Sequence, residues 1–146
     1  MTRCLRHFGI VVKDLDRALE FYCGKLGLSV SRRMEESGAF LDAVLAAPGT
    51  RVTTVKLAAE EGPTLLELLH FEAPKPGEAE MPSLFRTGVT HFALTVDDLN
   101  TLHESLSAGG TPFLSEPRKS PDGLAFVAFC RDPEGNLIEL VEPSAE

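Results

Sequence analysis

The stretch His7-Phe-Gly-Ile-Val-Val-Lys-Asp-Leu-Asp16 decides the fold, because it returns later in the chain as His91-Phe-Ala-Leu-Thr-Val-Asp-Asp-Leu-Asn100. The two stretches share His, Phe, an aliphatic residue, Val, Asp and Leu in the same register. A second pair closes the two copies, since Thr64-Leu-Leu-Glu67-Leu-Leu-His70 aligns with Asn136-Leu-Ile-Glu139-Leu-Val-Glu142. The chain therefore contains an internal repeat, and each copy opens on a strand histidine and closes on a strand glutamate.

Each copy is predicted to have the element order βαβββ, because the apolar pattern changes from strand periodicity to helix periodicity and back. Aspartates are suited to cap both helices, and glycines follow both helices. The first copy also carries an insertion, in which a short helix is predicted between Gly38 and Gly49. The predicted strands are 5–12, 28–34, 52–58 and 64–70 in the first copy and 89–96, 112–116, 125–130 and 137–141 in the second, and the predicted helices are 15–26 and 99–106.

The domain organisation follows from the same repeat. A chain of 146 residues with 43% hydrophobic content can bury the core of one globular domain. A proline-rich polar tract without periodicity, residues 73–82, separates the copies and is predicted to be a linker. We therefore predict a single domain over 1–146, made of an α+β module at 1–72 and a second at 83–146.

Composition and charge exclude several classes of function. The formal net charge is −8, and no basic cluster is longer than Arg32-Arg33 or Arg118-Lys119, so no nucleic-acid partner is expected. No apolar run approaches the length of a membrane span, and no membrane partner is expected either. Three cysteines without a C-x-x-C spacing predict neither a disulfide framework nor a zinc knuckle. A soluble, cytoplasmic protein is the interpretation that fits best.

Four polar residues are candidate metal ligands, namely His7, Glu67, His91 and Glu139. Strand alternation places each of them among apolar residues on its face, and no Lys or Arg occupies those four strand faces. Burying a carboxylate there is costly unless a cation pairs with it, and a divalent metal would serve both glutamates. A lone strand histidine is more often a core or surface residue, but four residues at equivalent positions of a repeat favour one divalent ion: Ni, Zn, Co, Mn or Fe(II).

Other polar residues are assigned structural roles. His70 points off the face of Glu67 by parity, and His103 lies among polar neighbours in the second helix, so both are predicted to be surface residues. The segment Asp132-Pro-Glu-Gly-Asn136 is predicted to be a tight turn before the final strand, in which Asp132 bonds the local backbone.

The motifs resemble those of the vicinal oxygen chelate superfamily, which includes glyoxalase I, methylmalonyl-CoA epimerase, extradiol dioxygenases and bleomycin resistance proteins. The similar motifs are His7-x-Gly-Ile-x-Val-x-Asp-Leu, His91-x-Ala-Leu-x-Val and Asp132-Pro-Glu-Gly-Asn-x-x-Glu-Leu. The resemblance implies paired βαβββ modules that curl a mixed sheet into a cleft, with a metal held by the four candidate ligands. It also implies a homodimer, in which the ligands come from one chain or from two.

The ligand set distinguishes the branches of this superfamily. Extradiol dioxygenases carry a histidine where Glu67 stands, and bleomycin-sequestering members lack the ligands. Glutathione-using glyoxalases typically carry Arg and Asn where this chain has Val11 and Phe71, which indicates a different small carbonyl or thioester substrate. The predicted substrate contacts are Val11, Phe40, Phe71 and Thr95.

The predicted activity is that of a metal-dependent lyase or isomerase of the glyoxalase I type, which removes a proton next to a carbonyl. Glu139 is predicted to be both ligand and general base, and Glu67 is the second catalytic carboxylate. Two alternatives stay open: an enzyme similar to methylmalonyl-CoA epimerase, and a non-catalytic small-molecule binding or antibiotic-resistance protein that uses an apolar cleft. An extradiol dioxygenase is a third alternative, which the ligand set disfavours.

Overall fold

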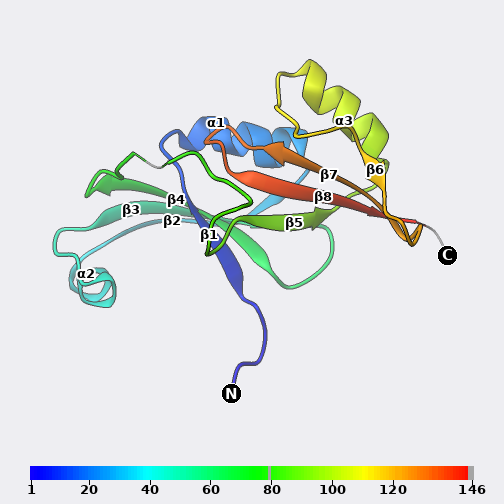
Figure 1. Cartoon of the computed structure of the whole chain (residues 1–146). Helices are drawn as coiled ribbons and strands as arrows, with labels where there is room; N and C mark the ends of the chain where they lie inside the picture. The colour runs from blue at the N-terminus through cyan, green and yellow to red at the C-terminus, as the bar shows by residue number, and fades with distance from the viewer. Residues whose placement is uncertain (79, 145–146) are drawn as a thin grey trace. The chain divides into compact units, whose positions relative to one another are not determined.

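The first copy of the repeat forms a four-stranded mixed sheet in the computed structural model of the chain, which describes residues 1–78 and 80–144. Its strands are β1 (His7–Val11), β2 (Ser29–Ser37), β3 (Arg51–Ala58) and β4 (Leu65–Ala73). Their order in the sheet is β1-β4-β3-β2, in which β1 runs parallel to β4 and the other neighbours are antiparallel (Figure 1). The first and last strands of the copy therefore lie side by side.

The connection from β1 to β2 is a short α-helix followed by a π-helix. Asp14 begins α1 (Leu15–Leu19), because its carboxylate accepts a hydrogen bond from the Arg17 backbone N–H at 3.0 Å. The chain then widens into η1 (Glu20–Lys25), where the Leu26 N–H donates to the carbonyl oxygen of Phe21, five residues earlier. The prediction of a single α-helix over 15–26 is therefore wrong in helix type, because an α-helix and a π-helix follow one another there. The insertion does contain a short helix, α2 (Ala39–Leu45).

The second copy forms an equivalent sheet with the order β5-β8-β7-β6. Its elements are β5 (His91–Thr95), α3 (Leu99–Ala108), β6 (Arg118–Lys119), β7 (Ala125–Arg131) and β8 (Leu137–Pro143). As in the first copy, the opening strand β5 runs parallel to the closing strand β8.

One predicted strand of the second copy, 112–116, is wrong. That segment makes only an isolated bridge between Phe113 and Cys130, and the short strand β6 follows it. Pro112 and Pro117 lack the backbone N–H that a strand donates, which limits pairing on both sides of the segment.

In each copy the helical segment packs against one face of the sheet, and the other face carries apolar residues as well as the candidate ligands. In the first, Val55 and Leu68 are fully buried with Ala18 and Tyr22 of the helical segment. In the second, Leu140 is fully buried, and α3 contributes a buried apolar stripe. The alternating positions of β4 and β8 that face away from these cores carry Glu67 and Glu139.

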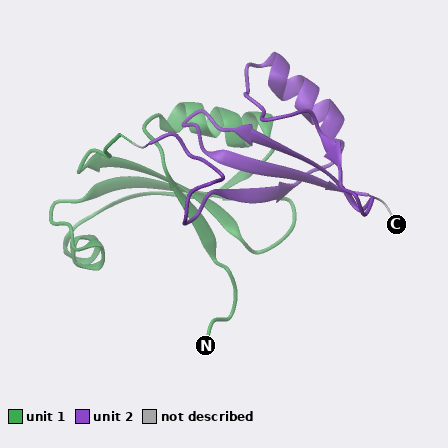
Figure 2. Ribbon diagram, in the orientation of Figure 1, with its two compact units in different colours: residues 1–78 green, residues 79–146 purple. Residues whose placement is uncertain are grey.

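The chain divides into two compact units, residues 1–78 and residues 79–146 (Figure 2). We refer to them as unit 1 and unit 2. β4 extends to Ala73, the first residue of the predicted linker. The division into modules 1–72 and 83–146 stays a prediction. In the described part of the chain, no helix is both long and apolar enough to cross a membrane.

Candidate functional site

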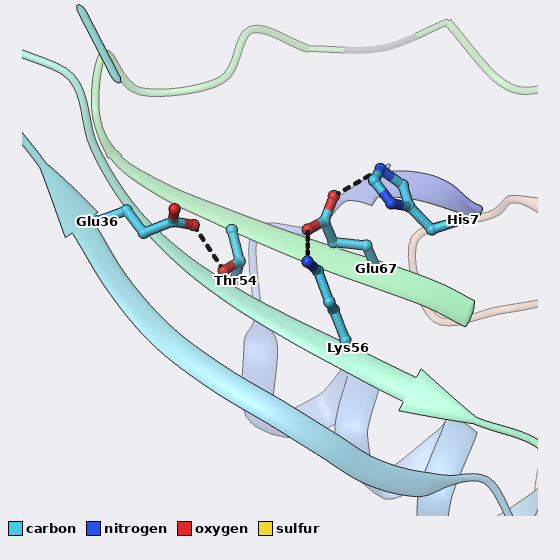
Figure 3. Close-up of polar contacts among 5 residues, drawn as sticks. All are labelled: His7, Glu36, Thr54, Lys56 and Glu67. Atoms are coloured by element: carbon cyan, nitrogen blue, oxygen red, sulfur yellow. Dashed lines mark hydrogen bonds and ion pairs between the residues drawn. The ribbon is translucent and has the colours of Figure 1, made fainter. Parts of the chain in front are cut away.

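His7 and Glu67 meet on the open face of unit 1, and we call this pair half-site 1. In the parallel register of β1 and β4, His7 lies opposite Leu65 and Gly9 lies opposite Glu67. The Nε2 atom of His7 is 3.2 Å from Oε2 of Glu67, and the Glu67 side chain is only 12% exposed (Figure 3). The sequence therefore places an imidazole and a partly buried carboxylate in direct contact.

His91 and Glu139 form the corresponding pair in unit 2, which we call half-site 2. His91 lies opposite Leu137 and Ala93 lies opposite Glu139, which repeats the register of half-site 1. The Nε2 atom of His91 is 3.4 Å from Oε2 of Glu139, whose side chain is 26% exposed. The other ring nitrogen of His91, Nδ1, is 2.8 Å from the hydroxyl of Thr90. This contact directs Nε2 toward the carboxylate.

Half-site 1 contains a cation that the sequence analysis missed. The Nζ atom of Lys56 on β3 is 3.8 Å from Oε1 of Glu67, so His7 and Lys56 each approach one carboxylate oxygen (Figure 3). The prediction considered only the four strands that carry the candidate ligands, and Lys56 comes from a neighbouring strand that lies directly opposite Glu67. Glu67 therefore has a cationic partner without a metal.

The two half-sites differ at the residue opposite the glutamate on the neighbouring antiparallel strand. Lys56 is the residue opposite Glu67 in the β3–β4 register, and Phe129 is the residue opposite Glu139 in the β7–β8 register. The Phe129 ring packs edge-on against the His91 imidazole, with the ring centroids 5.1 Å apart. One carboxylate thus faces an ammonium group, and the other faces an aromatic ring.

The donor atoms of each half-site fit a divalent metal. Ligands that bind one ion at ~2.1 Å lie about 3.0 Å apart at a right angle and about 3.4 Å apart at a tetrahedral angle. The observed nitrogen-to-oxygen separations are 3.2 and 3.4 Å. Each half-site offers one imidazole and one carboxylate, and residues 1–78 and 80–144 hold no group of three or more potential ligands.

Only some of the predicted substrate contacts lie near a half-site. Val11 and Phe71 share the face of half-site 1 by strand alternation, and the Val11 residue is 47% exposed. Thr95 shares the face of His91 at the end of β5. Phe40 is 82% exposed on α2. Because α2 joins the ends of β2 and β3 that pair near Ala73, it lies about 20 Å along the sheet from Glu67.

The repeat aligns His70 with Glu142, and the structure gives both residues a contact that the sequence analysis did not predict. Glu142 on β8 accepts a hydrogen bond from the Leu99 backbone N–H at 2.7 Å, at the start of α3. At the equivalent position of β4, Nδ1 of His70 is 3.2 Å from the carbonyl oxygen of Val12. His70 is thus partly buried and contacts the connection between β1 and α1.

The structural role predicted for the turn before β8 is confirmed. One carboxylate oxygen of Asp132 accepts from the backbone N–H groups of Glu134 and Asn136 at 2.9 and 2.8 Å. Its other oxygen accepts from the Asn136 side-chain amide at 3.0 Å. Gly135 has a φ of +89°, which disfavours any residue with a Cβ. This turn sets the start of the strand that carries Glu139.

Comparison with known proteins gives a family-level match over nearly the whole chain. The model of the family described as "Glyoxalase/Bleomycin resistance protein/Dioxygenase superfamily" matches residues 5–140. A probable lactoylglutathione lyase of Synechocystis is 29% identical over 143 residues, which is 97% of this chain and 97% of that protein. A lactoylglutathione lyase of Arabidopsis thaliana is also 29% identical, but there the chain spans only 44% of its relative's length.

Solved structures share the fold. A glyoxalase family protein from Bacillus cereus superposes with a TM-score of 0.89 at 23% identity, and the match covers 99% of this chain and 97% of that one. The trypanothione-dependent glyoxalase I of Leishmania major superposes with a TM-score of 0.66 at 26% identity, over 97% of this chain and 87% of that one. The predicted α+β fold of paired βαβββ modules is confirmed.

Proposed function

Because the chain belongs to the glyoxalase/bleomycin resistance protein/dioxygenase superfamily, we propose that it is a divalent-metal-dependent lyase or isomerase of the glyoxalase I type. The observation that carries this proposal is the register match between the two half-sites, in which an imidazole and a carboxylate recur at the same places in both units. Duplication explains the similar strands, and the recurrence of the same two donor types, imidazole and carboxylate, at matched positions supports metal binding.

In this proposal the two half-sites together supply the ligands His7, Glu67, His91 and Glu139. When bound, a divalent metal polarises the substrate carbonyl and makes the neighbouring C–H group more acidic. Thr90 contributes by holding Nδ1 of His91, which fixes the ring orientation and leaves Nε2 for binding. The ligand set is compatible with Ni, Zn, Co, Mn or Fe(II).

We assign the proton transfer to Glu139. Glu67 already pairs with the Lys56 ammonium group, whose Nζ atom is 3.8 Å from its Oε1. Phe129 occupies the corresponding place beside Glu139 and brings no positive charge. Glu139 is also the more exposed of the two side chains, at 26% against 12%, so a substrate proton can reach it. Glu67 then serves mainly to bind the metal and to orient the substrate.

Substitution of Glu139 by Gln tests the assignment. The variant keeps the side-chain size and one oxygen donor but removes the proton acceptor, so metal binding should weaken while turnover falls by at least about a hundredfold. Hemithioacetals and acyl-CoA thioesters are the substrates to assay, and the second class tests the alternative of an epimerase. Glu104→Gln on α3 is the matched control. Full activity of Glu139→Gln would show that another group takes the proton.

The substrate class is a small carbonyl or thioester compound. Relatives of this chain carry the name lactoylglutathione lyase. Val11 and Phe71, which share the face of half-site 1, offer a substrate only apolar contacts. A substrate with an apolar portion against these side chains fits better than one recognised through a polar tripeptide at these positions.

A homodimer and a cytoplasmic location also stay predictions.

A second candidate is a non-catalytic binding protein that holds an apolar small molecule. The exposure of Val11 at 47%, beside Phe71 on the same sheet face, favours it, because apolar residues on an open face gain from being covered. In that case an apolar compound binds the metal-free protein, and His91→Ala leaves the affinity unchanged. Loss of binding in that variant, or binding only after metal is added, would favour the enzyme.

A further inference from the structure

Three charged residues lie in one row across the sheet of unit 1. Arg32 on β2 is directly opposite Lys56 on β3, and Lys56 is directly opposite Glu67 on β4. Directly opposed residues of antiparallel strands project from the same face, with their Cβ atoms about 5 Å apart. Half-site 1 is therefore continued along its own face by two adjacent cations.

The two cations have little negative charge to pair with. Within residues 1–78 and 80–144, the ion pair of Lys56 is its 3.8 Å contact with Glu67, and Arg32 forms none. The other strand carboxylate on this face is Glu36, which accepts a hydrogen bond from the Thr54 hydroxyl at 2.8 Å (Figure 3). Two like charges on neighbouring strands repel each other, and of these two cations Glu67 contacts only Lys56 in the described part of the chain, so an anion beside Arg32 would stabilise the row.

Glu67 cannot fully serve both Lys56 and a metal. Under the proposed function, its oxygens donate electron density to the ion, which weakens their attraction for the ammonium group. Lys56 then stands beside Arg32 with its charge uncompensated, next to the place where the substrate binds.

We propose that Lys56 and Arg32 form an anion subsite, which binds a carboxylate or phosphate group of the substrate beside half-site 1. The role in substrate binding rests on the proposed function, whereas the affinity for anions does not. The guanidinium of Arg32 presents several N–H donors in one plane, and Lys56 adds a compact charge, so both can donate charge-assisted hydrogen bonds to one oxyanion. The preferred substrates are small carbonyl compounds that carry a negative charge.

The global charge of the protein does not account for such binding. The net charge is −8, so the overall field repels anions, and any affinity must come from local donors. Arg33 provides a matched control, because it is the next residue on β2, has the same charge and is also exposed, but lies opposite Val55 and so projects from the other face. Loss of its charge should leave anion binding at the subsite unchanged.

The test is a titration of the metal-free full-length chain with inorganic phosphate and, separately, with acetate, followed by NMR chemical shifts. Glu67→Gln releases Lys56 from its partner without any metal, so this variant should bind one or both anions about tenfold more tightly than the wild type. Adding Lys56→Met or Arg32→Met should abolish the gain, whereas Lys56→Arg and Arg33→Met should preserve it. Equal anion binding by Glu67→Gln with and without Lys56→Met would overturn the proposal. Thermal melts of each variant identify any that fail to fold.

A second measurement separates this proposal from the proposed function. In the metal-loaded enzyme, Arg32→Met should raise KM about tenfold for a carboxylate-bearing carbonyl substrate and leave KM for an uncharged one unchanged, with kcat retained for both. If the chain has no turnover at all, the proposed function fails while the anion titration still decides the subsite. Equal effects on charged and uncharged substrates would contradict the subsite even in an active enzyme.

Discussion

Phe129 lies directly opposite Glu139 in the β7–β8 register, and its ring meets the His91 imidazole edge-on at a centroid separation of 5.1 Å. The aromatic ring thus contacts one proposed ligand and lies beside the other. Together with the 2.8 Å contact between Thr90 and Nδ1 of His91, it restricts the orientation of the imidazole. Half-site 2 is preorganised by packing, whereas half-site 1 is held by the charge of Lys56.

Replacement of Phe129 by Leu tests this packing. Leucine preserves burial but removes the flat surface against which His91 rests, so metal affinity should fall about tenfold, as for other groups that orient a metal ligand. Competition with a chromophoric chelator measures the change. Phe126→Leu is the control, since that ring projects from the opposite face of β7 and lies under Lys119. Equal losses in the two variants would indicate a general loss of stability.

Replacement of Lys56 by Met should strengthen metal binding. The ammonium group competes with a metal for Glu67, and its removal leaves a carboxylate with more charge to donate. We expect affinity for Zn to rise about fivefold by chelator competition at low ionic strength, and the gain to shrink as salt screens the charge. Arg33→Met should change affinity little. Weaker binding in Lys56→Met would mean that the lysine positions Glu67 and does not compete for it.

Glu142 is predicted to stabilise unit 2 through α3. Its carboxylate accepts a hydrogen bond from the Leu99 backbone N–H at 2.7 Å, and this N–H group has no acceptor within the helix. Glu142→Ala should lower the free energy of unfolding by about 1–2 kcal/mol, as measured by urea denaturation. The exposed Glu104→Gln substitution on α3 should change it by less than about 0.5 kcal/mol. An unchanged free energy of unfolding in Glu142→Ala would show that water replaces the carboxylate at the Leu99 N–H group.

Because the Cys130 thiol is buried, we expect the folded protein to lose stability at alkaline pH. Burial, with the nearby Asp132 charge, raises the pKa of this thiol from 9.0 to about 12. The folded state therefore holds a proton that the unfolded state releases, so the stabilising contribution is complete below pH 9 and is lost as pH rises toward 12.

The slope expected from this thiol is at most ~1.4 kcal/mol per pH unit within that window. Cys130→Ala should flatten the decline of unfolding free energy between pH 9 and 11, although the variant is less stable at neutral pH because it leaves a cavity. Cys4, which is exposed, is the control for substitution. An unchanged slope in Cys130→Ala would assign the alkaline loss to other groups.

The fold could be predicted because the two copies of the repeat show the same pattern of strands and helix, so that each copy supports the assignment of the other. Strand alternation predicts the faces of His7, Glu67, His91 and Glu139, whereas the parallel pairing that brings each histidine to its glutamate is seen only in the structure. The turn at Asp132 could be predicted because its hydrogen bonds are local.

The features that the sequence analysis missed depend on contacts between strands. Lys56 lies eleven residues before Glu67 in the chain, and only the β3–β4 register shows that the two are neighbours. The π-helix at Glu20–Lys25 and the loss of the strand at 112–116 depend on how the backbone accommodates packing and proline. The sequence does not show whether another side chain covers Phe40. The structure shows that Phe40 is exposed on α2.

We propose that the two half-sites act as one metal centre, and the metal content per chain is the measurement that decides it. We would measure it by elemental analysis after reconstitution with Ni, Co, Zn, Mn or Fe(II), for the wild type and for His7→Ala and His91→Ala. About one equivalent per chain is expected whether the half-sites meet within one chain or between two copies, and each single substitution should remove it. Retention of metal by either variant, or no binding by the wild type under any of these conditions, would show that the half-sites do not form one metal centre.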